Sequence, residues 1–131
     1  MKKGVLFLVL LLVVSFGGCT NDDEDIEDVL TQGTWKVGYI NEGNDEDTSL
    51  FYGYVFTFLP DGTVTVDRPN IAQAPGTWNE HDDNTRLELD FGQSGLLERL
   101  NEDWFVDYVE DTEVGLHEAG KPYNQLRLDQ R

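Results

Sequence analysis

The segment FTFLPDGTVTV, residues 56–66, decides the fold of this chain. On each side of its centre, residues alternate in the two-residue period of β-strands that bury one face. Pro60 presets φ and Gly62 accepts a positive φ, so the Pro-Asp-Gly sequence predicts a tight turn. We therefore predict a β-hairpin, with Val64 and Val66 facing the same core as the phenylalanines.

The same alternation recurs along the chain on both sides of the hairpin. It predicts strands over residues 33–41, 52–59, 63–67, 75–80, 86–91, 103–110, 113–118 and 125–129. The expected inward residues include Trp35, Val37 and Tyr39 in the first strand, Tyr52, Tyr54, Phe56 and Phe58 in the second, and Trp104, Val106 and Tyr108 in the sixth. Residues 92–100 are ambiguous between a short helix and an irregular strand, and residues 25–31 allow one short helical turn.

These segments are joined by short turns rather than by long crossovers, which favours antiparallel pairing of neighbours in sequence. A meander of this length usually closes on itself, because closure removes exposed strand edges. The sequence thus predicts an all-β fold, an antiparallel meander of about eight strands that closes into a small β-barrel.

The N-terminus has the order of features found in secretory signals. Lys2 and Lys3 precede an apolar run over residues 4–16, and small residues lead into Cys19, the only cysteine of the chain. The run is shorter than the roughly 20 apolar residues that a membrane-spanning helix needs. Cys19 could instead be a cysteine without a role at the end of an ordinary signal peptide, or a buried thiol. An unpaired cysteine in an exported protein needs an explanation, however, which favours a role for Cys19.

The segment resembles a bacterial lipoprotein signal, although Phe16 stands where the usual motif has Leu. The resemblance implies cleavage before Cys19 and acylation of this cysteine by several chains, which anchor the protein in a membrane. Several chains are needed because a single acyl chain holds a protein only marginally. The acidic run that follows resembles the export signal of Bacteroidota lipoproteins, which implies an outer-membrane anchor at the cell surface, with the periplasmic face as the alternative. The expected organisation is a signal peptide (1–18), an acidic tether with a short helical turn (19–32) and a lipocalin-like barrel domain (33–131).

The charge of the chain bears on its partners. Nine Lys and Arg oppose 26 Asp and Glu, for a formal net charge of −17. Such a surface repels nucleic acids and anionic head groups, so we exclude nucleic-acid binding and expect membrane attachment only through the lipid on Cys19. The acidity suits solvation of an exposed protein, or affinity for cationic partners.

The order of the motifs in the barrel segment resembles that of the small lipocalin-like domain lipoproteins of Bacteroidota. The motifs are Gly33-Thr34-Trp35, the hairpin segment described above, Gly76-Thr77-Trp78, Leu100-Asn101-Glu102-Asp103-Trp104 and Leu126-Arg127-Leu128. The resemblance implies that Trp35 closes one barrel end, with Arg127 or Arg131 packed over it. The chain is shorter than a standard lipocalin and lacks its long helix before the last strand, so its cavity is expected to be small or filled by side chains.

The aromatic residues allow two interpretations. A ligand cavity would be lined by Tyr39, Tyr54, Phe56, Trp78, Trp104 and Tyr108. Alternatively, the same rings fill the core that a small β-domain requires. A third possibility is stacking of a sugar on Trp35, Trp78 or Trp104, if any of them is exposed.

Other chemistry has weaker signals. The loops around Asp45 and Asp47 and around Asp82 and Asp83 are rich in the oxygen ligands that calcium prefers, but neither has EF-hand spacing, and charged hairpin loops are the alternative. His81 and His117 are too far apart in sequence to predict a zinc site. Ser49 and Ser94 lack a recognisable base, although either histidine could approach them in the fold. We expect neither a cofactor nor catalysis.

The sequence therefore favours a surface-anchored lipocalin-like lipoprotein that binds a small apolar or aromatic-compatible ligand. The alternative is a non-enzymatic structural or protein-interaction module of an outer-membrane assembly, with a filled core.

Overall fold

The computed structural model describes residues 25–73 and 75–131. The predicted signal peptide, the lipid site at Cys19 and the first part of the acidic tether lie outside the described residues. The described chain begins at Asp25, whose side chain accepts a hydrogen bond from the Glu27 amide at 3.1 Å and caps the first helix. The short helical turn expected over residues 25–31 is confirmed as α2 (Ile26–Leu30).

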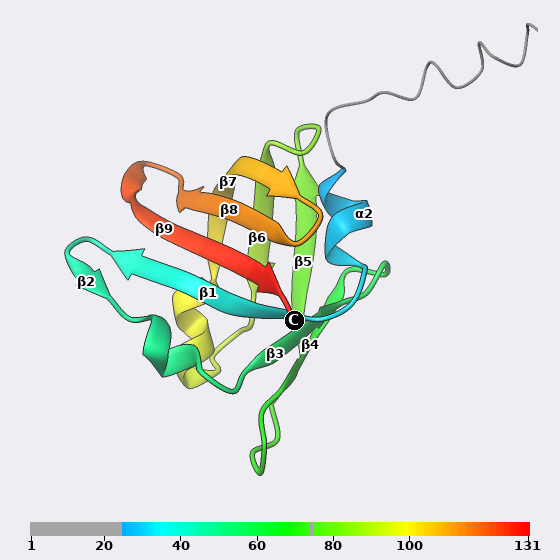
Figure 1. Ribbon diagram of the computed structural model, residues 1–131, viewed down its shortest axis with the longest axis vertical. Coiled ribbons are helices and arrows are strands. Elements are labelled where there is room, and N and C mark those ends of the chain that lie inside the picture. Colours follow the sequence, from blue (N-terminus) through cyan, green and yellow to red (C-terminus); the bar gives the residue numbers. More distant parts are fainter. Residues whose placement is uncertain (1–24, 74) are drawn as a thin grey trace, which may run out of the picture.

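Nine strands and two further short helices follow α2 (Figure 1). They are β1 (Trp35–Glu42), β2 (Asp45–Glu46), η1 (Thr48–Phe51), β3 (Val55–Phe58), β4 (Thr63–Asp67), β5 (Gly76–His81), β6 (Arg86–Asp90), η2 (Gly95–Leu100), β7 (Glu102–Glu110), β8 (Glu113–Glu118) and β9 (Lys121–Gln130). Of the helices in the described part of the chain, none has the length and hydrophobicity needed to cross a lipid bilayer.

The strands form one antiparallel sheet in the order β2-β1-β3-β4-β5-β6-β7-β8-β9, and β1 also pairs with β9. This second pairing of β1 closes eight of the strands into a barrel, with the two-residue β2 as an addition beyond them. The prediction of a small all-β antiparallel barrel is confirmed. In Figure 1, β1, β9 and β8 lie side by side on the face toward the viewer, and the end of β7 follows them at the top.

The hairpin predicted from residues 56–66 is present as β3 and β4. Phe56 pairs with Val66 and Phe58 with Val64, and all four side chains are buried. The turn closes through a hydrogen bond from the Gly62 amide to the Leu59 carbonyl at 3.0 Å, with Gly62 at φ 93°. The turn chemistry of the sequence thus sets the register that sends these apolar side chains inward.

The interior of the barrel is filled by apolar side chains. Its largest fully buried residues are Trp35, Trp104, Phe51, Phe56, Ile26, Leu30, Ile40, Leu87, Leu97, Leu100, Leu116 and Leu126. They come from the strands and also from the helices at the two ends of β1. Helix α2 packs near the start of β1, and η2 is tied to its end by ion pairs from Arg99 to Glu42 and Asp47.

The three tryptophans connect this core to the segments that cover it. Each indole N–H donates to a backbone carbonyl: Trp35 to Leu30 at the end of α2 (3.0 Å), Trp104 to Leu100 at the end of η2 (3.1 Å) and Trp78 to Leu59 before the hairpin turn (2.9 Å). Carbonyls at helix ends have no partner within the helix, so a buried indole satisfies a group that would otherwise be unpaired.

Two β-bulges reverse the predicted alternation. In β1 the register shifts between Val37 and Tyr39, and in β7 between Val106 and Tyr108. Each bulge inserts one residue that has no partner, so the side chains after it change faces. The prediction that Tyr39 and Tyr108 point inward is therefore wrong: both lie on the outer surface, and Ile40 takes the buried position in β1.

Some strand boundaries also differ from those predicted. Strand β9 begins four residues early, at Lys121, and the ambiguous segment after β6 contains the helix η2. Strand β3 begins at Val55, because the chain before it forms η1. Tyr52 consequently lies outside the strand and is 70% exposed, rather than inward as predicted.

The indole hydrogen bonds predict a stability test. Trp35→Phe leaves the Leu30 carbonyl without its buried donor and removes ring volume from the core, so the free energy of unfolding should fall by about 2–4 kcal/mol. Urea denaturation followed by circular dichroism measures the change. Trp78→Phe, whose hydrogen bond is only partly buried, should cost less. Equal losses in the two variants would contradict the assigned role of the α2 contact.

Candidate functional site

The two bulges place both tyrosines in one row on the outside of the barrel. Tyr108 of β7 pairs with Gly115 of β8, Gly115 pairs with Arg127 of β9, and Arg127 pairs with Tyr39 of β1. Residues in register on neighbouring strands point to the same face of a sheet. The row therefore presents an aromatic ring at each end, with a glycine and an arginine between them.

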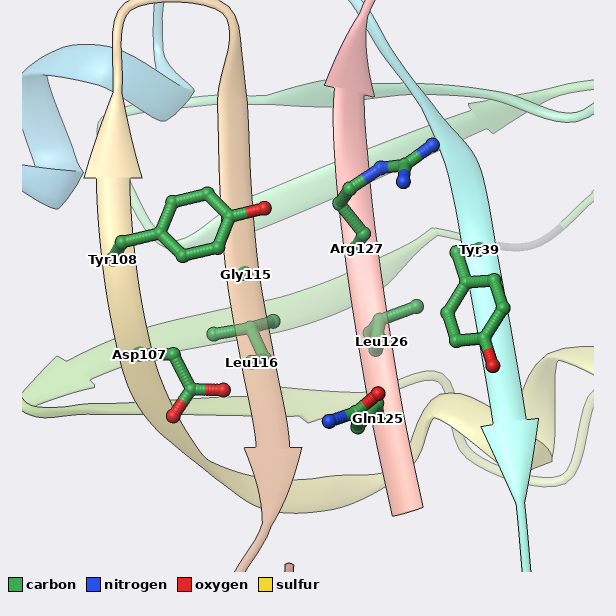
Figure 2. Close-up of a pocket in the computed structure, with 8 residues that line it drawn as sticks. All are labelled: Tyr39, Asp107, Tyr108, Gly115, Leu116, Gln125, Leu126 and Arg127. Atoms are coloured by element: carbon green, nitrogen blue, oxygen red, sulfur yellow. The ribbon is translucent and has the colours of Figure 1, made fainter. Parts of the chain in front are cut away.

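This row lines an open groove of about 300 Å³. Its lining residues are Tyr39, Asp107, Tyr108, Gly115, Leu116, Gln125, Leu126 and Arg127. Figure 2 shows the ring of Tyr108 extending across Gly115, with Arg127 and Tyr39 on the next two strands and the side chains of Asp107 and Gln125 beside them. Leu116 and Leu126 also line the groove, although their side chains are buried in the barrel.

Tyr108 is held flat against the sheet from two sides. A Cβ atom at Gly115 would overlap the ring of Tyr108, so only glycine leaves room for the ring at this position. The phenol also donates a hydrogen bond to the Glu113 carboxylate. The ring remains 38% exposed, which leaves surface for a ligand to contact.

Partial burial, together with the hydrogen bond to Glu113, raises the pKa of Tyr108 from 10 to about 12. Both effects disfavour the phenolate, because burial removes its hydration and Glu113 places a negative charge beside it. Tyr108 is thus a neutral phenol throughout the physiological pH range, suited to stacking and hydrogen bonding rather than to acid–base chemistry.

Arg127 is fixed by contacts along β9 and β1. It donates to both carboxylate oxygens of Asp129, at 2.9 and 3.1 Å, and to the Gly38 carbonyl at 3.1 Å. Gly38 leaves room for this arrangement, because a Cβ atom at its position would overlap the Asp129 carboxylate. The hydrogen bonds to Asp129 raise the pKa of Arg127, which stays a cation between the two tyrosines.

Further polar groups border the groove. His117 lies 2.6 Å from the Asp107 carboxylate through Nδ1, and its ring packs edge-on against Phe105 with 5.3 Å between centroids. Gln125 is in register with His117 and is exposed at the lower edge of the groove. The site therefore combines aromatic faces with an amide, a carboxylate and a guanidinium. Such polar groups can form hydrogen bonds that fix the orientation of a polar ligand.

The remaining predicted ligand residues lie elsewhere. Phe56, Trp78 and Trp104 are buried in the core, and Tyr54 is buried beside a separate cleft. The structure thus brings together only Tyr39 and Tyr108 of the six. The interpretation of the other rings as core residues agrees with their burial, and all three tryptophans are too buried to stack on a sugar.

The predicted barrel-closing pair is separated. Trp35 is fully buried near the barrel end, whereas Arg127 lies on the outer face, because its neighbours Leu126 and Leu128 take the inward positions of β9. Arg127 therefore does not pack over Trp35, and that part of the prediction is wrong. The residue that bonds the Trp35 indole is Leu30 of α2.

The calcium candidates are spread over two loops. Asp47 accepts a hydrogen bond from Arg99 and Asp82 one from Arg86, while Asp45 and Asp83 are exposed. Within residues 25–73 and 75–131, no three His, Cys, Asp or Glu side chains converge on a position for a metal ion.

Each of the two histidines lies beside a carboxylate in the part of the chain that the structure describes. His81 lies 3.1 Å from Glu88, and His117 pairs with Asp107 as described. The hydroxyl of Ser94 donates to the Phe91 carbonyl, and Ser49 is exposed in η1.

Two glycines are the signal for the groove that the sequence contains. Gly38 and Gly115 both lie inside predicted strands, where glycine often marks a bulge or a close approach. Both positions accommodate a side chain of the outer face, Asp129 at Gly38 and Tyr108 at Gly115. These glycines thus indicate a close approach on the two strands, although not which residues make it.

The Tyr108 environment predicts a titration result. In the full chain, the pKa of about 12 should fall toward 10 in Glu113→Gln, because the neighbouring negative charge is lost, and in Gly115→Ala, because the ring must leave its place. Tyrosine ring carbon shifts followed by NMR against pH measure this value, with Tyr108→Phe to assign the signal. An unchanged value in both variants would show that the described contacts do not form.

Comparison of the sequence with models of protein families, with curated proteins and with solved structures finds no match in any of the three. The resemblance to lipocalin-like lipoproteins therefore stays a prediction.

Proposed function

We propose that this protein is a non-catalytic binding module that holds a small, aromatic-compatible ligand in the outer groove. The observation that carries the proposal is the placement of Tyr39 and Tyr108 in one cross-strand row by two separate bulges. Bulges cost regular pairing and are often found next to functional sites, where they re-aim a side chain. Two of them re-aiming tyrosines toward one groove favours a binding role.

The chemistry of the groove favours a neutral ring that carries hydroxyl groups, such as a sugar. The apolar face of such a ring can lie on the exposed side of Tyr108, whose own hydroxyl is already bonded to Glu113. Gln125 offers a donor and an acceptor, Asp107 an acceptor and Arg127 a donor. Hydroxyls both donate and accept, so they can satisfy this mixed set.

The filled interior also favours an outer site. Side chains from all eight barrel strands and from the helices at its ends occupy the space that a lipocalin-type ligand would need. Both the outer groove and the cleft beside Tyr54 open to solvent. An apolar ligand buried inside the barrel would have to displace packed core residues at a cost of several kcal/mol.

The proposed setting of this module is the outer membrane, with the barrel held at the cell surface by lipid on Cys19. The support is the sequence of the first 25 residues: a charged start, an apolar run, a single cysteine and an acidic stretch. Attachment to the periplasmic face is the alternative setting.

A second candidate function is an interaction module of an outer-membrane assembly. The filled core is the observation that favours it, because such a module needs a rigid surface and no cavity. Failure of the groove to bind any neutral sugar would favour this candidate over the first.

The binding proposal is tested by titrating the full chain with maltotriose, cellotriose and mannotriose. Amide NMR shifts should change around Gly115 and Arg127 for at least one of them. Tyr108→Ala and Tyr39→Ala should each weaken that binding about five- to tenfold, through loss of ring contact.

Tyr123→Ala is the matched control. Tyr123 is a tyrosine of β9 with 60% exposure that does not line the groove, so its loss should leave sugar binding unchanged. Absence of binding for all three sugars, or equal weakening by Tyr123→Ala, would contradict the assignment of the groove.

The anchoring proposal has its own test. In a bacterial host that acylates lipoproteins, the full chain should fractionate with membranes, and Cys19→Ala should appear in the soluble fraction, because the lipid attachment is lost. Fractionation and labelling with a radioactive fatty acid measure both. A Cys19→Ala variant that stays with the membrane would contradict lipid anchoring at this residue.

A further inference from the structure

The sheet is almost open between β1 and β3. These strands share a single register pair, Trp35 with Phe56, whereas β1 and β9 share six. Beyond Trp35, the chain from β1 turns through β2 and η1 before it returns to β3 (Figure 1). The separation leaves an open cleft of about 440 Å³, within the size range of small-molecule sites.

The inner wall of this cleft is apolar and partly aromatic. Val37, Phe51 and Tyr54 line it and are buried, and the rings of Phe51 and Tyr54 lie 6.0 Å apart. Tyr52 stands at the rim and is 70% exposed. The cleft thus offers an apolar surface for the body of a ligand, with the exposed ring of Tyr52 at its entrance.

The rim is basic, in contrast to the rest of the molecule. Lys36 and Arg131 line the cleft, and Arg131 also lines an adjoining depression with Arg68. The guanidinium of Arg68 lies 4.9 Å from the centre of the Tyr54 ring and donates to the Tyr54 hydroxyl at 3.2 Å. Arg127 lines the cleft as well, bonded to Asp129. Lys36, Arg68 and Arg131 therefore lie around the cleft and its adjoining depression, in a chain whose net charge is −17.

These cations differ from the others in their pairing. Arg86, Arg99, Lys121 and Arg127 each have a carboxylate within 4.0 Å. Lys36, Arg68 and Arg131 have none among the carboxylates that the structure describes, although acidic residues outnumber basic ones almost threefold along the chain.

Two carboxylates do border this region. Asp129 lines the cleft, but both of its oxygens accept hydrogen bonds from Arg127. Asp67 lines the adjoining depression without an ion pair to Arg68 in the described structure. The positive charge at the opening is therefore not cancelled by direct pairing.

We propose that the cleft binds a small organic anion, a molecule with a carboxylate or sulfonate head and an apolar or aromatic body. The head would lie between Lys36 and Arg131, and the body would lie on Phe51 and Tyr54. A cationic patch attracts a small anion at short range. The acidic surface around it still repels nucleic acids and anionic bilayers at longer range. The cleft adjoins the outer groove, because Arg127 lines both of them. The contacts proposed for the anion are made by other residues, so they do not depend on the sugar proposal.

The test compares two fluorescent probes that differ in charge. Anilinonaphthalene sulfonate is an aromatic anion, and phenylnaphthylamine is its uncharged parent. The full chain should bind the sulfonate more tightly, and this preference should shrink as salt rises, because the added attraction is electrostatic. Fluorescence titration measures both affinities.

Charge-neutral variants locate the site. Lys36→Gln and Arg131→Gln should each weaken sulfonate binding about two- to fivefold, the effect of one exposed ion pair, and leave the uncharged probe unaffected. Lys121→Gln is the matched control, since Lys121 is an exposed cation outside the cleft. It should not change sulfonate binding.

Three outcomes would overturn the proposal: equal affinity for the two probes, no effect of Lys36→Gln and Arg131→Gln, or an equal effect of Lys121→Gln. Because sugar binding is measured on other residues with other probes, either proposal can fail while the other stands.

Discussion

The structure depends on one choice of partner: β1 pairs along its length with β9 and scarcely with β3. This pairing closes the barrel and places Tyr39 beside Arg127, which completes the row that begins at Tyr108. The same pairing draws β1 away from β3 and leaves the cleft between them. Both proposed sites are therefore consequences of how the barrel closes, one on the closing strands and the other at the position where pairing is lost.

The barrel can support outer sites because its interior is fully used. Each tryptophan both fills the core and satisfies a carbonyl of a covering segment, so the ends of the barrel are fixed by hydrogen bonds as well as by apolar contact. A rigid, filled barrel holds its outer side chains in constant relative positions, which a preformed binding site needs. Glycine at positions 38 and 115 then lets outer side chains lie close to the sheet.

Much of the fold could be predicted because its signals are local. The turn at Gly62, the alternation of Phe56 and Phe58 with their neighbours, and the short connections are properties of consecutive residues, and they led to the correct class and closure. The candidate site could not be predicted to the same extent. Alternation assigns Tyr39 and Tyr108 to the inside, and only the bulges, which add a residue relative to the partner strand, reverse them.

The sequence alone determined an acidic, all-β chain with turns in defined places, because composition, turn chemistry and period are carried by neighbouring residues. The tertiary structure alone decided which side chains meet. Lys36, Arg68 and Arg131 are far apart in the chain, and their approach to the cleft and its adjoining depression follows from barrel closure. The face of the sheet on which Tyr39 and Tyr108 lie follows from the register between strands, which no single strand encodes.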